Sequence, residues 1–188
     1  FGGQGMAYFL FSDILGDHKI QLGTEITVNL ARSDYFLFYR LLPYKIDWNF
    51  VFYHLAYEYV HTNYYESISY IRLFQDLGIR IEAIRPLSRF NRLKVAVDID
   101  HIIESIMEDV SDNSSVQELK QNYVESFTTV IPRVKYVWDN ALWAFMHPVA
   151  GSRFYLKYRT SPGINKKSLT FHSATFDGRK YFKLFNGV

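Results

Sequence analysis

The chain has 188 residues, a formal net charge of +2 and no cysteine, and 18% of its residues are aromatic. The nearly balanced charge argues against a nucleic-acid-binding protein, and the lack of cysteine excludes a disulfide scaffold, a thiolate metal site and a cysteine nucleophile. The length suits one domain, or one part of a larger closed structure. The 15 Tyr and 16 Phe are typical of strands and of water–lipid boundaries.

Alternation of apolar and polar residues predicts about nine β-strands, because the side chains of a strand point alternately to its two faces. In chain order the predicted strands cover residues 6–12, 18–28, 35–42, 48–60, 74–87, 91–103, 128–139, 152–161 and 168–184. Residues 61–73 are expected to form a longer loop or a strand extension, and residues 109–126 a solvent loop with a short helical turn. Sequential strands with almost no helix predict an all-β fold, an antiparallel up-and-down meander.

The clearest two-faced strand covers residues 93–100. Its odd positions, from Leu93 to Ile99, are β-branched or Leu, and its even positions carry charge or Ala. The same pattern along the chain predicts one polar face, whose charged members include Lys19, Glu25, Arg80, Glu82, Lys94, Asp98, Asp100, Arg133 and Lys135. In a membrane barrel these residues would face a water-filled lumen, and in a soluble sandwich they would face the solvent.

Strand length and aromatic placement separate these two architectures. Transmembrane strands need roughly 9 to 11 residues, whereas strands of soluble proteins usually have about 5 or 6. Several predicted strands meet the longer requirement, and Trp48, Tyr57, Tyr59 and Trp138 lie near strand ends, as in the aromatic girdles of outer-membrane barrels. The pattern favours part of a transmembrane β-barrel, and a soluble β-barrel or sandwich that binds an apolar ligand or a protein partner is the alternative.

Four segments carry a family resemblance. Residues 11–18 (FSDILGDH), 85–92 (RPLSRFNR), 137–143 (VWDNALW) and 148–154 (PVAGSRF) resemble, in order and spacing, motifs of the outer-membrane barrels that follow TolB-like propeller domains. Those barrels are of the Omp85 or bacterial surface antigen type. The residues that carry the likeness at turns are Asp13, Gly16, Asp17, Pro86, Arg89, Asp139, Asn140 and Gly151.

The resemblance implies a location in the bacterial outer membrane and a non-enzymatic role in the assembly or translocation of outer-membrane proteins. Residues 1–188 would then form a single partial barrel domain, with a periplasmic domain upstream and further barrel strands downstream. The implied partners are outer-membrane lipid and other outer-membrane or periplasmic proteins, and not nucleic acid.

No residue pattern in the chain indicates an enzyme, a metal site or a cofactor. The histidines are scattered, with no Ser or carboxylate at a recognisable catalytic spacing. Asp98, Asp100, His101 and Glu104 could be read as a metal cluster, but Asp98 and Asp100 share one face of their predicted strand and His101 points to the other, which argues against it. We therefore predict structural roles for these residues.

Overall fold

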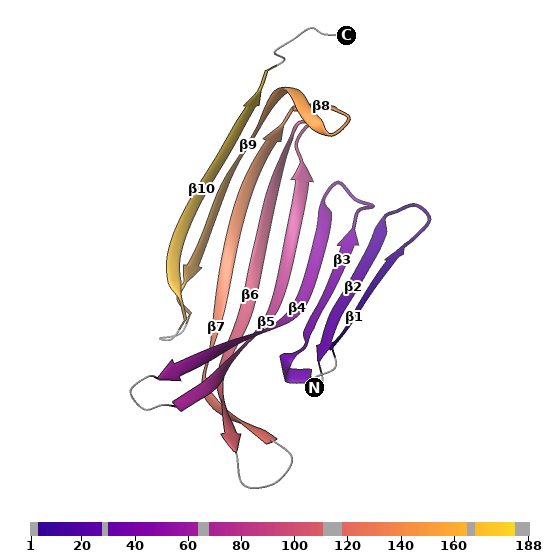
Figure 1. Cartoon of the computed structure of the whole chain (residues 1–188). Helices are drawn as coiled ribbons and strands as arrows, with labels where there is room; N and C mark the ends of the chain where they lie inside the picture. The colour runs from indigo at the N-terminus through magenta and orange to yellow at the C-terminus, as the bar shows by residue number, and fades with distance from the viewer. Residues whose placement is uncertain (1–3, 28–29, 64–67, 111–117, 165–167, 183–188) are drawn as a thin grey trace.

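The computed structural model describes residues 4–27, 30–63, 68–110, 118–164 and 168–182, which form one antiparallel sheet (Figure 1). The strands are β1 (Gln4–Ser12), β2 (His18–Thr27), β3 (Asp34–Leu41), β4 (Asp47–Asn63), β5 (Ile68–Pro86), β6 (Asn91–Val110), β7 (Glu118–Asp139), β8 (Leu142–Ala144), β9 (His147–Pro162) and β10 (Thr170–Tyr181). Within these residues no helix is long and apolar enough to span a membrane.

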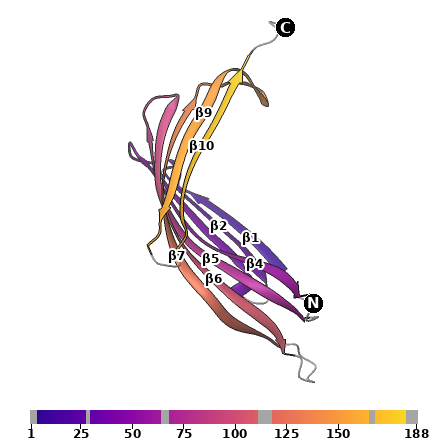
Figure 2. The same ribbon diagram turned by 90° about the vertical axis from the view of Figure 1, so that its left-hand side faces the viewer.

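The strand order confirms the predicted all-β up-and-down meander. Among the described residues, nine strands pair in sequence order, and the short β8 pairs only with β9. The sheet is twisted and curved (Figure 2). It is not closed into a barrel, because β1 and β10 lie at its two edges without pairing to each other (Figure 1).

The central strands are longer than predicted. Of the two alternatives for residues 61–73, the strand extension is correct, because β4 runs to Asn63 and β5 starts at Ile68. The solvent loop predicted for residues 109–126 is wrong in its described part. Residues 118–126 belong to β7 and pair with β6, with a register irregularity at Glu104 and Ser105. Residues 111–117 lie outside the described residues.

The cross-strand register separates the sheet into two faces, because directly paired residues point to the same side. On β5, β6 and β7, for example, Arg80 lies opposite Asp98, and Lys94 lies opposite Lys135. All nine charged residues predicted to share a polar face occupy this side, which we term the charged face. The opposite side, which we term the apolar face, carries Val95, Val97 and their cross-strand neighbours.

The apolar face is not covered by other parts of the described chain. Val95, Val97 and Ile99 expose 45%, 38% and 41% of their surface. Only three apolar residues of the described part are buried, namely Leu73, Ala96 and Val137. The sheet therefore forms no hydrophobic core of the usual kind, in which one apolar layer packs against another.

Candidate functional site

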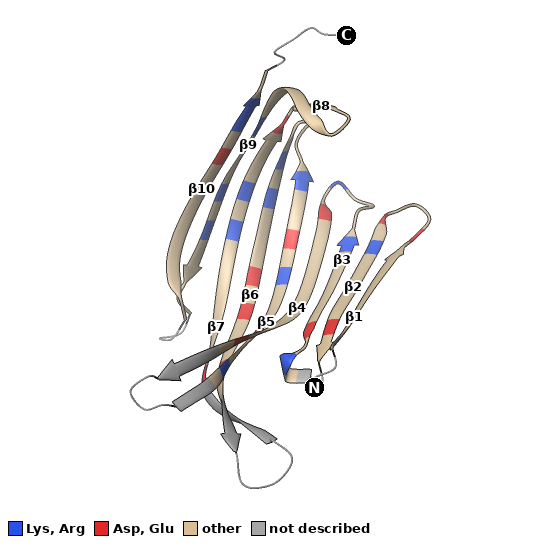
Figure 3. Cartoon of the chain, in the orientation of Figure 1, with Lys and Arg blue, Asp and Glu red and all other residues tan. Residues whose placement is uncertain are grey.

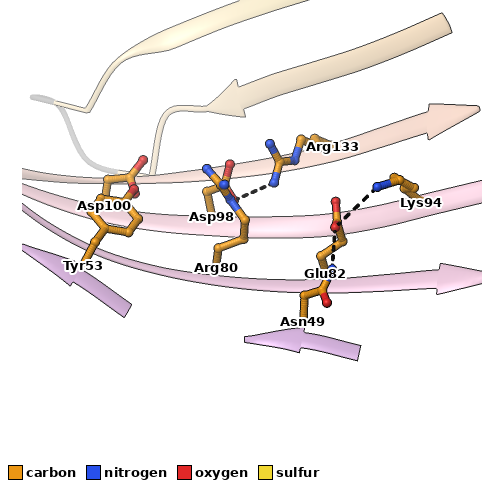
Figure 4. A network of polar contacts seen from close by, with 8 residues as sticks. All are labelled: Asn49, Tyr53, Arg80, Glu82, Lys94, Asp98, Asp100 and Arg133. Atoms are coloured by element: carbon orange, nitrogen blue, oxygen red, sulfur yellow. Dashed lines mark hydrogen bonds and ion pairs between the residues drawn. The ribbon is translucent and has the colours of Figure 1, made fainter. Parts of the chain in front are cut away.

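The centre of the charged face is built around Asp98 of β6 (Figure 4). Its Oδ1 accepts hydrogen bonds from Nε of Arg80 at 2.7 Å and from a terminal guanidinium nitrogen of Arg133 at 3.2 Å. These partners come from the strands on either side, β5 and β7, and Asp98 is only 7% exposed. One carboxylate thus joins two guanidinium groups, which leaves positive charge in excess at this point.

A second series of polar contacts lies beside Asp98 and connects β3, β4, β5 and β6. Nε of Arg40 donates to Asn49 Oδ1 at 3.1 Å, and Asn49 Nδ2 donates to Glu82 Oε1 at 2.9 Å. The ammonium group of Lys94 lies 3.8 Å from the same Glu82 oxygen (Figure 4). Asn49 is 5% exposed. Its side-chain amide links the guanidinium of Arg40 to the carboxylate of Glu82.

The third part of the network contains Tyr53, which lies opposite Gly78 on the neighbouring strand. Tyr53 belongs to β4 and Gly78 to β5, and the Tyr53 ring occupies the space that a Cβ atom at Gly78 would fill. The Tyr53 hydroxyl reaches Asp100 on β6 and donates a hydrogen bond of 2.5 Å to Oδ1 (Figure 4). A glycine within a strand permits this approach, because it has no side chain to displace the ring.

The remaining predicted members of the charged face lie outside this network. Lys19 lies opposite Arg40, and Glu25 lies opposite Asp34. The ammonium group of Lys135 lies 3.8 Å from the ring centre of Tyr155, which is a cation–π contact. The network therefore brings together Arg80, Glu82, Lys94, Asp98, Asp100 and Arg133 on three adjacent strands, and leaves Lys19, Glu25 and Lys135 outside it.

Three members of the network are missing from the sequence prediction. Arg40 and Asn49 belong to strands whose apolar residues dominate both faces. Tyr53 is an aromatic residue in a strand with apolar residues on both faces, so alternation does not indicate that it lies on the charged face. The sequence signal for the position of Tyr53 is Gly78, because an isolated glycine within a strand indicates that a neighbouring backbone or side chain lies close to it. Gly23 is a second example, because the ring of its cross-strand partner Phe36 occupies the space that a Cβ atom at Gly23 would fill.

The turn residues of the family-like segments at the first hairpin stabilise its backbone. Asp13 accepts a hydrogen bond from the amide of His18 through Oδ1, at 2.9 Å, and its carbonyl accepts one from Gly16. Gly16 has a φ of 76°, in the region that favours glycine. The carbonyl of Asp17 accepts a hydrogen bond from Leu42, which attaches this turn to the end of β3.

The other family-like turns meet at the same end of the sheet, where the chain connects β5 to β6 and β7 to β9 (Figure 1). Pro86 ends β5, and the guanidinium of Arg89 lies over the Phe90 ring at 6.0 Å. The amide of Asp139 donates to the carbonyl of Phe90, and so connects the two turns.

Asn140 and Gly151 complete this group. Asn140 Oδ1 accepts hydrogen bonds from both the amide and the hydroxyl of Ser152. Gly151 has a φ of 96°, and a Cβ atom there would overlap the carbonyl of Asn140. Segments far apart in sequence thus gather at one end of the sheet, and each of their turn residues has a backbone or turn role.

At the opposite end of the sheet, the 3₁₀ turn η1 (Leu30–Arg32) is tied to β4 by an ion pair. The guanidinium of Arg32 donates two hydrogen bonds to the carboxylate of Glu58. Hydrogen bonding to Glu58 raises the pKa of Arg32. This pair fixes the connection between β2 and β3 to the lower part of β4.

Histidines and carboxylates form no metal site within the described residues. His101 lies on the apolar face and its Nδ1 contacts the hydroxyl of Thr128 at 2.9 Å, away from Asp98 and Asp100. His18 and His172 likewise contact tyrosine hydroxyls, of Tyr39 and Tyr158, at 2.8 Å. His18 and His101 each contact one hydroxyl group, whereas His172 contacts a second one, that of Thr160, at 2.9 Å. The three histidines do not converge on one point.

Comparison with known proteins adds no relative: no family model and no curated protein matches the chain.

Proposed function

We propose that the chain forms part of the wall of a bacterial outer-membrane β-barrel, with the apolar face against lipid and the charged face towards a water-filled lumen. One observation carries this proposal. On four strands the apolar face bears a band that polar residues bound at both ends, and on β5 and β6 the length of this band matches the number of residues that a strand needs to cross a bilayer.

The band can be measured on four strands. On the apolar face of β6 it lies between Asn91 and His101, and on β5 between Arg85 and Gln75, with nine residues between the two bounding residues in each case. On β9 it lies between Ser152 and Thr160, and on β10 between Lys180 and His172, with seven residues between the two bounding residues in each case. A strand needs about 9 to 11 residues to cross a bilayer. The bounded length meets this requirement on β5 and β6, and on β9 and β10 it does so when the two bounding residues are included.

The exposure of this band supports lipid contact. Ile79, Ile81, Leu156 and Phe176 expose 39%, 43%, 55% and 69% of their surface. Soluble monomers rarely expose contiguous apolar patches above a few hundred Å², whereas this band crosses the sheet from β1 to β10.

Aromatic rings at one boundary of the band also support a membrane position. Near the end with the family-like turns, the Trp138 ring contacts those of Phe90 and Phe154, both at centroid distances of 6.2 Å. Trp48 and Phe50 stack at 6.3 Å on β4. Such rings are enriched at membrane–water interfaces.

The free edges of β1 and β10 indicate further strands in the complete wall, since an unpaired edge within lipid leaves backbone groups without hydrogen bonds. We propose an Omp85-type role in the assembly or translocation of outer-membrane proteins, because four segments resemble that family and their turns gather at one end of the sheet. The role is non-enzymatic and needs no cofactor.

A soluble β-protein that binds an apolar ligand is the second candidate. A pocket of about 530 Å³ favours it, with Leu22, Leu37, Phe52 and Ile79 among its lining residues. A lipid acyl chain and a free apolar ligand would suit the same lining.

Cell fractionation of the expressed protein separates the two candidates. The barrel proposal expects the protein in the outer-membrane fraction, with a gel mobility that changes on heating after mild detergent extraction. Recovery in the soluble fraction without a heat-dependent mobility change would reject the barrel and favour the ligand-binding protein.

A further inference from the structure

The charged face is strongly cationic on the side formed by β6, β7 and β9 (Figure 3). Lys94, Lys135 and Lys157 lie directly opposite one another on these three strands. In the neighbouring row, Arg133 lies opposite Arg159. We term these five residues the basic rows.

Like charges directly opposite each other destabilise a sheet. Adjacent strands lie about 4.8 Å apart, so three lysines in register span roughly 10 Å. No acidic residue interrupts either row, since the direct neighbours of Lys157 and Arg159 on β10 are Thr175 and Ser173. The arrangement therefore concentrates positive charge instead of alternating it.

The carboxylates nearest to the basic rows already have partners, two of which, Lys94 and Arg133, belong to the rows themselves. Asp98 binds Arg80 and Arg133, while Asp139 pairs with Arg153 at 3.5 Å and Asp177 pairs with Arg179 at 3.0 Å. Glu82 accepts from Asn49 and lies near Lys94. None of these carboxylates forms an ion pair with Lys135 or Lys157, although Asp177 is close enough to Lys135 for a coulombic attraction.

Three cations of the basic rows consequently form no ion pair with any described residue. Lys135 lies over the ring of Tyr155, and Arg159 lies over the ring of Phe171 at 5.5 Å. No described carboxylate pairs with Lys157. Because aromatic faces attract cations without neutralising them, the positive charge of this region is left for another anion.

We propose that the basic rows bind a phosphate-type oxyanion, centred between Lys135 and Lys157. A tetrahedral oxyanion has acceptors for several ammonium groups at once, and Lys is a common phosphate ligand. The hydroxyls of Thr175 and Ser173 lie opposite Lys157 and Arg159, where they can donate to the remaining oxygens. The small extent of the lysine row fits one compact anion.

This inference goes beyond the proposed function, because it assigns a ligand class to the charged face. Rings of Arg and Lys side chains line anion and phosphate pores. In a closed barrel the basic rows would place positive charge on the lumen wall and so favour the passage of anions. The binding itself needs only the single sheet, and so it can be tested whether or not the protein enters a membrane.

Calorimetric titration of the purified, folded chain with inorganic phosphate in a low-chloride buffer tests the proposal. We expect saturable binding that weakens as salt is added, and at least tenfold weaker binding in the double variant Lys135→Gln with Lys157→Gln. Lys135→Arg should retain binding. Lys45→Gln, which removes one cation in the exposed turn between β3 and β4, is the matched control and should bind as the unaltered chain does.

Absence of saturable phosphate binding to the unaltered chain would overturn the proposal. It would also be overturned if Lys45→Gln lost as much affinity as the double variant, since the binding would then follow net charge. Binding of a polyglutamate peptide but not of phosphate would overturn it in favour of an acidic segment. Removing lysines relieves repulsion, so the variants should unfold at the same temperature as the unaltered chain or higher.

Discussion

At the scale of single residues, Asp98 is the group on which the charged face depends most. Alternation places Lys94 and Asp98 on the same polar face and so predicts mild effects for both Lys94→Ala and Asp98→Ala. The structure distinguishes them, because Asp98 is 7% exposed and accepts from two guanidinium groups, whereas Lys94 makes one contact at 3.8 Å. The effect of a substitution follows from its partners and not from its face alone.

We expect Asp98→Ala to lower the free energy of unfolding by about 2 kcal/mol, because Arg80 and Arg133 lose their shared acceptor and repel each other. Lys94→Ala should lower it by less than about 1 kcal/mol. Urea titration of both variants measures the difference. Equal losses would contradict the assigned network.

Gly78 is a second residue with a specific expected effect. A Cβ atom there would overlap the Tyr53 ring, so Gly78→Ala must displace the ring and weaken its hydrogen bond to Asp100. We expect a loss of about 1–3 kcal/mol. Gly5→Ala is the matched control, since nothing lies within 4 Å of the new methyl group. If both variants lost the same stability in urea titration, the ring would not lie over Gly78.

At the scale of elements, the sequence predicts the strands well where a two-residue period is clear. On β2, β5, β6, β7 and β9 the predicted faces agree with the observed register. Alternation is absent from β3, where aromatic and aliphatic residues occupy both faces. The sequence of β3 therefore does not indicate on which face its partner in β4, Tyr53, lies. Residues 118–126 are hydrophilic and were predicted as a loop, but pairing with β6 overrides local composition.

The apolar band of β6 gives a position-dependent prediction. Arginine at Val95 or Val97, near the middle of the band, should block membrane assembly, because Arg at the midplane of the bilayer costs about 2–4 kcal/mol. Arginine at Leu93 or Ile99, nearer the ends, should be tolerated better. The measurements are the amount of protein in the membrane fraction and its heat-dependent gel mobility. Equal effects at all four positions would contradict a bilayer bounded by Asn91 and His101.

At the scale of the whole molecule, one sheet has a charged face, an apolar face and two unpaired edges, at β1 and β10. The alternation predicts the existence of the two faces, and the predicted meander places the family-like turns at one end, because they follow the first, fifth and seventh predicted strands. Neither predicts the basic rows, since their residues are up to 65 positions apart in sequence, from Lys94 to Arg159, and only the register aligns them.

Spin labelling along β6 tests the orientation of the sheet most directly. The chain has no cysteine, so single cysteines can be placed and labelled one at a time from Leu93 to Asp100 in the membrane-extracted protein returned to lipid vesicles. Labels at positions 93, 95, 97 and 99 should be relaxed by oxygen, which concentrates in lipid, and those at 94, 96, 98 and 100 by a water-soluble nickel complex. Labels that all respond to nickel, or an alternation of the opposite phase, would contradict an apolar face in contact with lipid.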